Sequence, residues 1–385
     1  MTRGLTLLFA IAGGAAVGNL YWAQPLLGDI AQDFGVAIGT AGFLVTMTQV
    51  GYATGVLFIV PLGDTRDRRK LIPILMGCSA LALIASALAP TFALLMVSLA
   101  AIGLTTVAGQ LLTPLAGDLA RDDQRGRIVG TVVSGLLTGI LTSRTISGLL
   151  ADALGWRAIF AAAAVVMLVI AIVMRRSLPS IPPRAAIPYG TLLKSVFAAV
   201  AKHRKVQVTL VLNATAFSAF MMFWTGLTFL LSSPPFSYSV TQIGLVGLIG
   251  LAGALAARRA GVLHDKGWSV AATGVALLFI LVSLIAAYLG ATSIIALLAV
   301  VLLIDVAFQG ANVLNQTRVL SVDPSARSRL NTAFVTSNFI GGAIGSSLAG
   351  ILWQSGGWPS VMTGAAALVV AALAVWVLGR GTLKG

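Results

Sequence analysis

Residues 125–156 read RGRIVGTVVSGLLTGILTSRTISGLLADALGW, and residues 327–358 read RSRLNTAFVTSNFIGGAIGSSLAGILWQSGGW. The second stretch repeats the first at an offset of 202 residues. The matches are clearest where Arg127, Gly139 and Gly155-Trp156 meet Arg329, Gly341 and Gly357-Trp358. A repeat this long predicts two structural halves in the same orientation.

The composition identifies the class of protein. Of 385 residues, 58% are hydrophobic and 9% are charged, against roughly 25% charged in soluble domains, and the mean hydropathy is +0.98. The apolar stretches, most near the ~20 residues of a membrane-spanning helix, lie near residues 5–27, 41–60, 71–89, 91–114, 128–150, 158–174, 207–231, 242–257, 269–289, 293–316, 330–353 and 361–378. We therefore predict an all-α membrane protein with twelve transmembrane helices in two parallel six-helix halves.

The net charge of +14 reflects the orientation of the chain in the membrane. If the N-terminus is cytoplasmic, every Lys and Arg except Arg144 and Arg157 falls on the cytoplasmic side, as the positive-inside rule describes. This distribution predicts that both termini are cytoplasmic. It favours a lipid bilayer as the partner of the basic residues and argues against nucleic acid.

One long loop separates six apolar stretches from the other six. It runs from Arg175 to Lys205 and contains four prolines, which resist a continuous helix. The predicted domains are residues 1–175 as the N-terminal half, 176–206 as a cytoplasmic linker and 207–385 as the C-terminal half.

Enzyme chemistry has no candidate site in this sequence. Cys78 is the single cysteine, and both histidines fall in predicted loops, so no cluster has metal-site spacing. No Walker-type phosphate loop is present. We expect no metal, no cofactor and no enzymatic activity.

Residues 60–70, VPLGDTRDRRK, resemble the signature loop between the second and third helices of the major facilitator superfamily. Val60 and Asp67 stand where that signature has glycine, and residues 261–267 form a weaker second copy. Three further segments, residues 19–27, 144–148 and 305–316, resemble the branch of drug:proton antiporters and sugar-efflux proteins. The resemblance implies a monomeric secondary transporter of the bacterial inner membrane that works by alternating access.

The signature loop supplies a candidate cytoplasmic gate, meaning a set of charges that closes the cytoplasmic face in one state. A carboxylate among guanidinium groups makes strong charge-assisted hydrogen bonds. The alternative is that these are solvated loop charges, worth a few tenths of a kcal/mol each. The predicted gate residues are Asp64, Arg68, Arg69, Asp118, Arg125 and Asp265.

The fifth predicted span resembles the superfamily's antiporter motif, with Arg144 in place of its proline. A cation this deep in the membrane costs roughly 3 kcal/mol or more unless it is paired or hydrated. We expect Arg144 to have a partner; the alternative is that its long side chain extends to the membrane surface.

Asp305 is the natural candidate for that partner, since it is the one acidic residue predicted to lie mid-membrane. Burial disfavours its charged form and a nearby Arg favours it, and these opposed effects suit a reversible proton carrier. Asp305 and Arg144 are therefore the predicted proton-coupling residues. The alternative is that Asp305 is a permanently neutral structural acid.

Polar side chains recur at helical spacing in the predicted spans, as in Asp305, Gln309, Asn312 and Gln316. Such faces point to the protein interior or to water. By the superfamily's architecture, the first, fourth, seventh and tenth helices line a central cavity. The predicted substrate-cavity residues are Asn19, Tyr21, Trp22, Gln24, Gln110, Asn213, Phe217, Phe220, Trp224, Gln309, Asn312 and Gln316.

These residues suit a neutral or amphipathic small organic solute, either a drug-like compound or a sugar. Our first hypothesis is its proton-coupled efflux. The alternatives are a symporter or uniporter, and a non-transporting sensor on the same fold. One difference from the family weakens the hypothesis of a drug exporter. Residues 99–103 lack the Arg that many proton-coupled exporters carry in the fourth helix.

Overall fold

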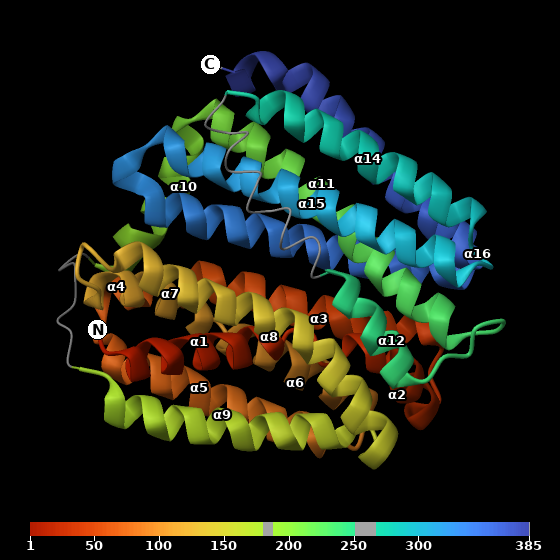
Figure 1. The fold of residues 1–385 in the computed structure, drawn as a ribbon, viewed down its shortest axis with the longest axis horizontal. Helices are drawn as coiled ribbons and strands as arrows, with labels where there is room; N and C mark the ends of the chain where they lie inside the picture. The colour runs from red at the N-terminus through yellow and green to blue at the C-terminus, as the bar shows by residue number, and fades with distance from the viewer. Residues whose placement is uncertain (180–187, 251–266, 385) are drawn as a thin grey trace. The chain divides into compact units, whose positions relative to one another are not determined.

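The computed structural model describes residues 1–179, 188–250 and 267–384, and regular secondary structure in that part of the chain is helical throughout (Figure 1). Asp265 therefore lies outside the described residues, as does all of the second loop copy at residues 261–267 except Gly267. The chain divides into two compact units. Unit 1 comprises Met1–Ile30, Met47–Leu193 and Ser239–Gly244, and unit 2 comprises Ala31–Thr46, Lys194–Tyr238 and Leu245–Gly385.

Unit 1 is built around two helix pairs: α1 runs alongside α8, and α5 runs alongside α9 (Figure 1). Its complete helices are α1 (Arg3–Gly18), η1 (Gln24–Leu26), α4 (Leu62–Thr65), α5 (Arg68–Ala87), α6 (Phe92–Thr105), α7 (Ala108–Leu119), α8 (Arg125–Leu154) and α9 (Arg157–Ser177). Four helices are shared between the units: α2 (Leu27–Phe34), α3 (Ile38–Phe58), α10 (Tyr189–Lys202) and α12 (Val240–Val246).

Unit 2 is built around the pairing of α11 with α16 and of α14 with α15. Its helices are α11 (Arg204–Ser232), η2 (Gly247–Gly250), α14 (Ser269–Leu289), α15 (Ile294–Val322), η3 (Pro324–Ala326) and α16 (Arg327–Lys384). α16 consists of two helices that meet at a break in helical geometry at Gly356 and Gly357.

Within the described residues, nine helices are long and apolar enough to cross a membrane. They do not match the twelve predicted spans one for one. The first predicted span is a shorter helix, α1; the eighth, residues 242–257, runs into residues that are not described; and one candidate, Pro324–Leu383, covers the last two. The count of twelve, the domain boundaries and the cytoplasmic location of the termini stay predictions.

Local sequence explains where several helices begin. The Asp67 carboxylate accepts from the backbone N–H of Arg69 at 2.9 Å and caps α5, and the Thr91 hydroxyl accepts from Leu94 at 3.3 Å and caps α6. Such caps satisfy donors that the first turn of a helix leaves unpaired. Asp67, a departure from the family's signature loop, thus has a structural task.

Glycines bring the central helix pairs close together, and they do so at equivalent positions of the repeat. In α8, Gly139 lies against the backbone of Gly14 in α1; in α16, Gly341 lies against the backbone of Ala214 in α11. A Cβ atom at either position would collide with that backbone. Small residues allow helices to approach closely where lipid gives no hydrophobic drive for their association.

The Gly-Trp ends of the repeat adopt the same local structure in both units. Gly155 has φ 84° and Gly357 has φ 61°, a left-handed region that favours glycine. The tryptophans that follow, Trp156 and Trp358, are both buried, and Trp358 donates its indole N–H to the carbonyl of Ala287 at 2.9 Å. The matching Gly-Trp ends of the repeat therefore have a structural role in both units.

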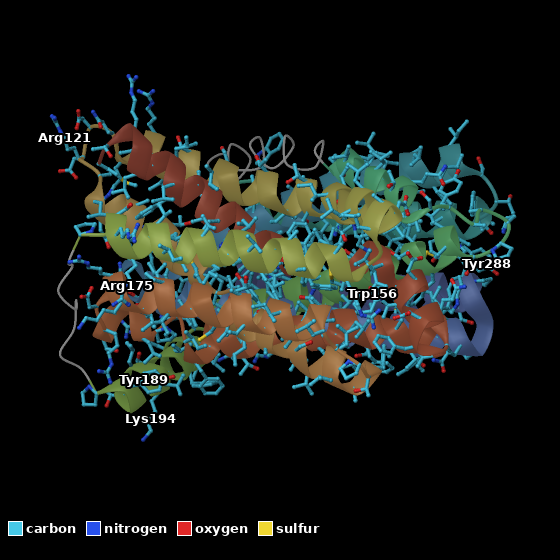
Figure 2. The ribbon with its side chains drawn as sticks, turned by 90° about the horizontal axis from the view of Figure 1, so that it is seen from below. Arg121, Trp156, Arg175, Tyr189, Lys194 and Tyr288 are labelled. Carbon is cyan, nitrogen blue, oxygen red and sulfur yellow. The ribbon has the colours of Figure 1, made fainter. Side chains whose placement is uncertain are left out.

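Basic residues gather at one end of unit 1. In Figure 2, Arg121 and Arg175 lie at one end of its helices and Trp156 lies toward the other. α8 joins these two ends without a break, from Arg125 to Leu154, and has Arg144 where the family's motif has proline. Without that proline, no backbone donor is lost in the middle of the helix.

We expect Gly341→Ala to destabilise the protein by about 1–3 kcal/mol, because its Cβ would lie 2.8 Å from the carbonyl carbon of Ala214. The matched control is Gly310→Ala in α15, where a Cβ would meet nothing within 4 Å. Removing that mid-helix glycine should be neutral or stabilise by up to about 1 kcal/mol. Thermal unfolding of the purified variants in detergent measures both, and equal effects would contradict the close approach of α11 and α16.

Candidate functional site

Arg68 is the centre of the charged cluster predicted as the gate. It begins α5 and is only 5% exposed. Its guanidinium donates to Asp118 at 2.9 Å and to Asp64 at 3.1 Å, and its Nε donates to the carbonyl of Gly63 at 2.7 Å. A single fork-shaped cation thus ties α4 and α7 to the start of α5, which suits arginine better than lysine.

The other predicted gate residues are placed differently. Arg69 is exposed, and within the described residues it forms no ion pair. Arg125 donates its Nε to the carbonyl of Gly117 at 2.9 Å, which fastens the start of α8 to the end of α7. The structure therefore brings together Asp64, Arg68 and Asp118; their role as a gate stays a prediction.

Arg144 lies on α8 and is 7% exposed, so its side chain does not extend to the surface. Within unit 1 its Nε donates to Oε1 of Gln24 at 3.0 Å, and its guanidinium carbon lies 5.2 Å from the centre of the Tyr21 ring. An amide oxygen and an aromatic face both stabilise a cation. The expected pairing with Asp305 involves the other unit and stays a prediction.

A chain of hydrogen bonds fixes the segment that follows α1. The indole N–H of Trp22 donates to Oδ1 of Asn19 at 2.8 Å, and the Asn19 amide donates to the Thr106 hydroxyl at 3.3 Å. Ser147 on α8 donates to the Trp22 carbonyl at 2.7 Å. Asn19, Trp22 and Gln24, predicted as cavity residues, are thus buried groups that join α1 to α6 and α8.

Gln110 has its own partner in unit 1. Its amide donates to the Tyr52 hydroxyl at 2.9 Å, which links α7 to α3. Gln110 is half-buried and Tyr52 is fully buried.

In unit 2, four asparagines form a continuous hydrogen-bonded cluster across α11, α15 and α16. The amide of Asn213 donates to Asn338 at 2.7 Å and to Asn312 at 2.9 Å, and its Oδ1 accepts from Asn315 at 2.8 Å. Asn338 also donates to Asn312 at 3.2 Å. The sequence predicted Asn213 and Asn312 and missed Asn315 and Asn338.

Arg318 continues this cluster and was also missed. The sequence placed it with the basic residues of the cytoplasmic side, but it is 2% exposed. It donates to Asn315 at 2.7 Å, to Ser269 at 2.7 Å and to Thr273 at 3.2 Å, which ties α15 to α14. The signal in the sequence was spacing, because Asn312, Asn315 and Arg318 follow one another at intervals of three residues.

The predicted aromatic stripe of α11 stacks on α15. The rings of Phe220 and Phe308 lie 4.3 Å apart and those of Phe217 and Phe308 lie 5.4 Å apart, both stacked. Phe339 of α16 lies 5.8 Å from Phe217, and Trp224 lies 6.5 Å from Phe220. Phe308 and Phe339 were not predicted, because neither lies in the seventh span, where the stripe was read.

Asp305 lies one turn before Phe308 on the same face of α15 and is 5% exposed. Further along that helix, Gln309, Asn312 and Gln316 are half-buried. The Gln316 amide donates to Asn331 at 2.9 Å. One side of α15 therefore presents a buried acid, then a stacked ring, then neutral amides.

A metal site has no candidate in the part of the chain that the structure describes. Among the residues that the structure describes, no group of three or more His, Cys, Asp or Glu side chains is placed to hold an ion.

Comparisons with known proteins agree with this fold. The family model described as Major Facilitator Superfamily matches residues 8–321. An uncharacterized transporter of Escherichia coli O157:H7, YgaY, is 42% identical over 98% of this chain and 96% of its own length. A probable transporter of Streptomyces coelicolor, SCO4007, is 33% identical over 94% of this chain and 84% of its own length. The crystal structure of the nucleoside transporter NupG superposes with a TM-score of 0.79 at 15% identity, covering 97% of this chain and 99% of that one.

We expect Arg68→Gln to destabilise unit 1 by about 3 kcal/mol, because it removes the cation that pairs with two partly buried carboxylates. Arg69→Gln, at the next and exposed position, should change stability by less than about 0.5 kcal/mol. Thermal unfolding in detergent compares the two. If both variants lose the same stability, Arg68 is not the centre of the cluster.

Asn315→Leu should destabilise by about 2–3 kcal/mol, since it removes an oxygen that accepts from the buried Arg318 guanidinium. The double variant Asn315→Leu/Arg318→Met should recover part of that loss, because the buried charge is then gone as well. Asn331→Leu, at a half-buried position, is the control. A double variant less stable than Asn315→Leu would contradict this account.

Proposed function

The chain belongs to the major facilitator superfamily and is a multi-pass membrane transporter of that type, and from this we propose that it exports a small organic solute in exchange for protons. In this proposal it is a secondary active transporter that works by alternating access in a bacterial inner membrane. Asp305 takes up and releases the proton.

The observation that carries the proposal is the burial of Asp305 within a membrane-spanning helix. A carboxylate costs several kcal/mol to bury in hydrocarbon, so acids in such helices mark ion or substrate pathways by default. Asp305 lies beside Phe308 and on the same helix as three half-buried amides. Protonation there changes the charge next to the surface that would contact a solute.

Arg144 is the second element of the proposal. It is a buried cation whose partners in unit 1 are the neutral Gln24 amide and the Tyr21 ring. A guanidinium close to a titrating carboxylate stabilises the ionised form of that carboxylate. We propose that Arg144 makes the deprotonated form of Asp305 accessible during the cycle.

The solute class follows from the groups on α11 and α15. Stacked rings at Phe217, Phe220 and Phe308 suit a flat apolar body, and the amides of Gln309 and Asn312 suit neutral donors and acceptors. This mixture favours a neutral or amphipathic compound, either drug-like or a sugar, over a small inorganic ion.

The alternatives differ in what they require of Asp305. A uniporter or a non-transporting sensor needs no titrating group, whereas a symporter needs one but moves solute and proton in the same direction. Measuring proton movement and solute movement together therefore separates all of them.

We expect Asp305→Asn to abolish proton exchange while sparing solute binding, because the amide keeps the shape of the acid but cannot ionise. Chloramphenicol and lactose serve as neutral drug-like and sugar probes, with binding read from thermal stabilisation of the purified protein. Proteoliposomes containing a pH-sensitive dye then report proton efflux when the stabilising probe is added.

Asp323→Asn is the matched control, because Asp323 has the same side chain but lies outside the membrane-spanning segments at the end of α15. It should behave as the unmodified protein does, whereas Asp305→Asn should lose proton efflux by about tenfold or more. Unchanged proton exchange in Asp305→Asn would rule out its role, and co-movement of probe and proton would favour symport.

A further inference from the structure

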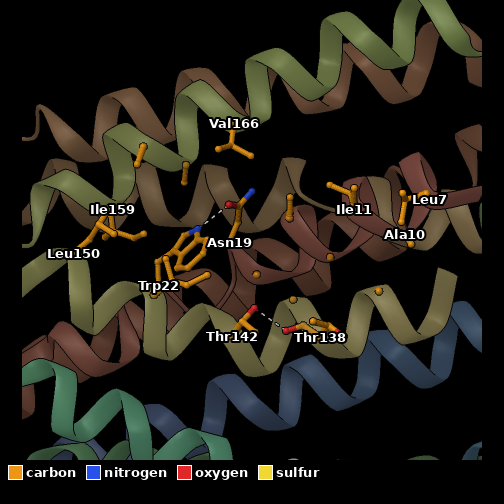
Figure 3. A pocket seen from close by; sticks show the side chains of 18 residues that line it. Leu7, Ala10, Ile11, Asn19, Trp22, Thr138, Thr142, Leu150, Ile159 and Val166 are labelled. Carbon is orange, nitrogen blue, oxygen red and sulfur yellow. Dashed lines mark hydrogen bonds between the residues drawn. The ribbon is translucent and has the colours of Figure 1, made fainter. Parts of the chain in front are cut away.

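An apolar groove runs along the outside of unit 1 between α1, α8 and α9, with a volume of about 520 Å³. Figure 3 shows Leu7 and Ile11 near one end and Trp22, Leu150 and Ile159 near the other. The volume lies within the range of roughly 300–1,000 Å³ of small-molecule sites. Leu7 and Ile11 are exposed, and exposed apolar side chains on a membrane helix suit contact with hydrocarbon.

The polar groups of the groove are already satisfied within the protein. The hydroxyls of Thr138 and Thr142 donate to backbone carbonyls of their own helix at 2.8 Å, which leaves their methyl groups for an occupant. Asn19 is bonded to Trp22 and Thr106. A hydrocarbon chain in the groove therefore leaves no donor or acceptor unpaired.

A second, basic pocket of about 280 Å³ continues the groove at the start of α1 and α8. Leu7 lines both. The basic pocket also has Arg3, Arg127, Gln124 and Thr131, and both arginines are exposed. Since α1 begins at Arg3 and α8 at Arg125, the positive ends of two helix dipoles add to the charge of the arginines.

The dimensions suit one lipid chain. Leu7 and Gly18 of α1 both line the groove, and at ~1.5 Å per residue they are about 16 Å apart along the helix. One leaflet of a bilayer contributes ~15 Å of hydrocarbon. The groove thus extends over the depth of one leaflet, with its charged end where a headgroup lies.

We propose that the groove and the basic pocket bind one anionic glycerophospholipid. Its phosphate lies at Arg3 and Arg127, and one acyl chain follows α1, α8 and α9. The charge of the basic pocket selects a lipid over an uncharged apolar solute, because such a solute would not need two arginines at the mouth of its site. By the positive-inside rule this is a lipid of the cytoplasmic leaflet.

Native mass spectrometry of the full chain, released from detergent with equal amounts of dioleoyl-phosphatidylglycerol and dioleoyl-phosphatidylcholine, tests the headgroup site. The unmodified protein should retain the anionic lipid preferentially. Arg3→Gln/Arg127→Gln should reduce that preference about tenfold or more, as each Arg near a charged lipid surface contributes severalfold. Arg175→Gln/Arg176→Gln, which changes two exposed arginines at the end of α9 outside both pockets, should leave it unchanged.

Ala162→Phe tests the acyl-chain groove, because Ala162 lines it. The preceding residue, Ala161, is exposed and does not line it, so Ala161→Phe is the control. Ala162→Phe should reduce retention of both lipids about fivefold, and Ala161→Phe should not. Equal retention of the two lipids by the unmodified protein would overturn the proposal, as would equal loss in the two double arginine variants. So would a change in oligomeric mass in Ala162→Phe with unchanged lipid retention, which would assign the groove to a second copy of the chain. None of these readouts depends on transport.

Discussion

The close backbone approach of helices at glycine is the constraint on which each unit depends. In a bilayer, lipid tails are as apolar as leucine, so the hydrophobic effect does not hold one helix against another. Gly139 against Gly14 in unit 1, and Gly341 against Ala214 in unit 2, bring whole helices into van der Waals contact. Many small contacts then replace the missing hydrophobic drive.

This approach also sets where the polar groups meet. Ser147 lies two turns beyond Gly139 on α8 and reaches the carbonyl of Trp22 because α8 is held against the segment that follows α1. Asn338 lies one turn before Gly341 on α16 and reaches Asn213 on α11 in the corresponding way. In each unit, close packing and buried hydrogen bonds act on the same pair of helices, so neither helix of the pair can shift without the other.

Three buried arginines show how this protein keeps a cation out of water by different means. Arg68 has two carboxylates, Arg144 has an amide and a ring in its own unit, and Arg318 has an asparagine and two hydroxyls. Carboxylates neutralise the charge of a guanidinium, whereas amide oxygens, hydroxyls and rings solvate it. The same residue type thus occupies three different environments in one chain.

The sequence alone determined the helical membrane class, through composition, and the equivalence of the two repeats, through matched glycines such as Gly155 and Gly357. It also singled out Arg68, Asp118, Asn213 and Asn312 as candidate site residues, because charged and polar residues are so rare in such a chain that each one stands out. Only the tertiary structure decided which of them are partners: Arg68 rather than Arg69 meets Asp118, and Asn19 and Trp22 bond to each other. The tertiary structure also added Arg318, which the sequence had only counted among the basic residues of the cytoplasmic side, and Asn315 and Asn338, which it had not singled out. Helical spacing defines one face of one helix, whereas a hydrogen-bonded cluster needs the distances between helices, and those are set by packing.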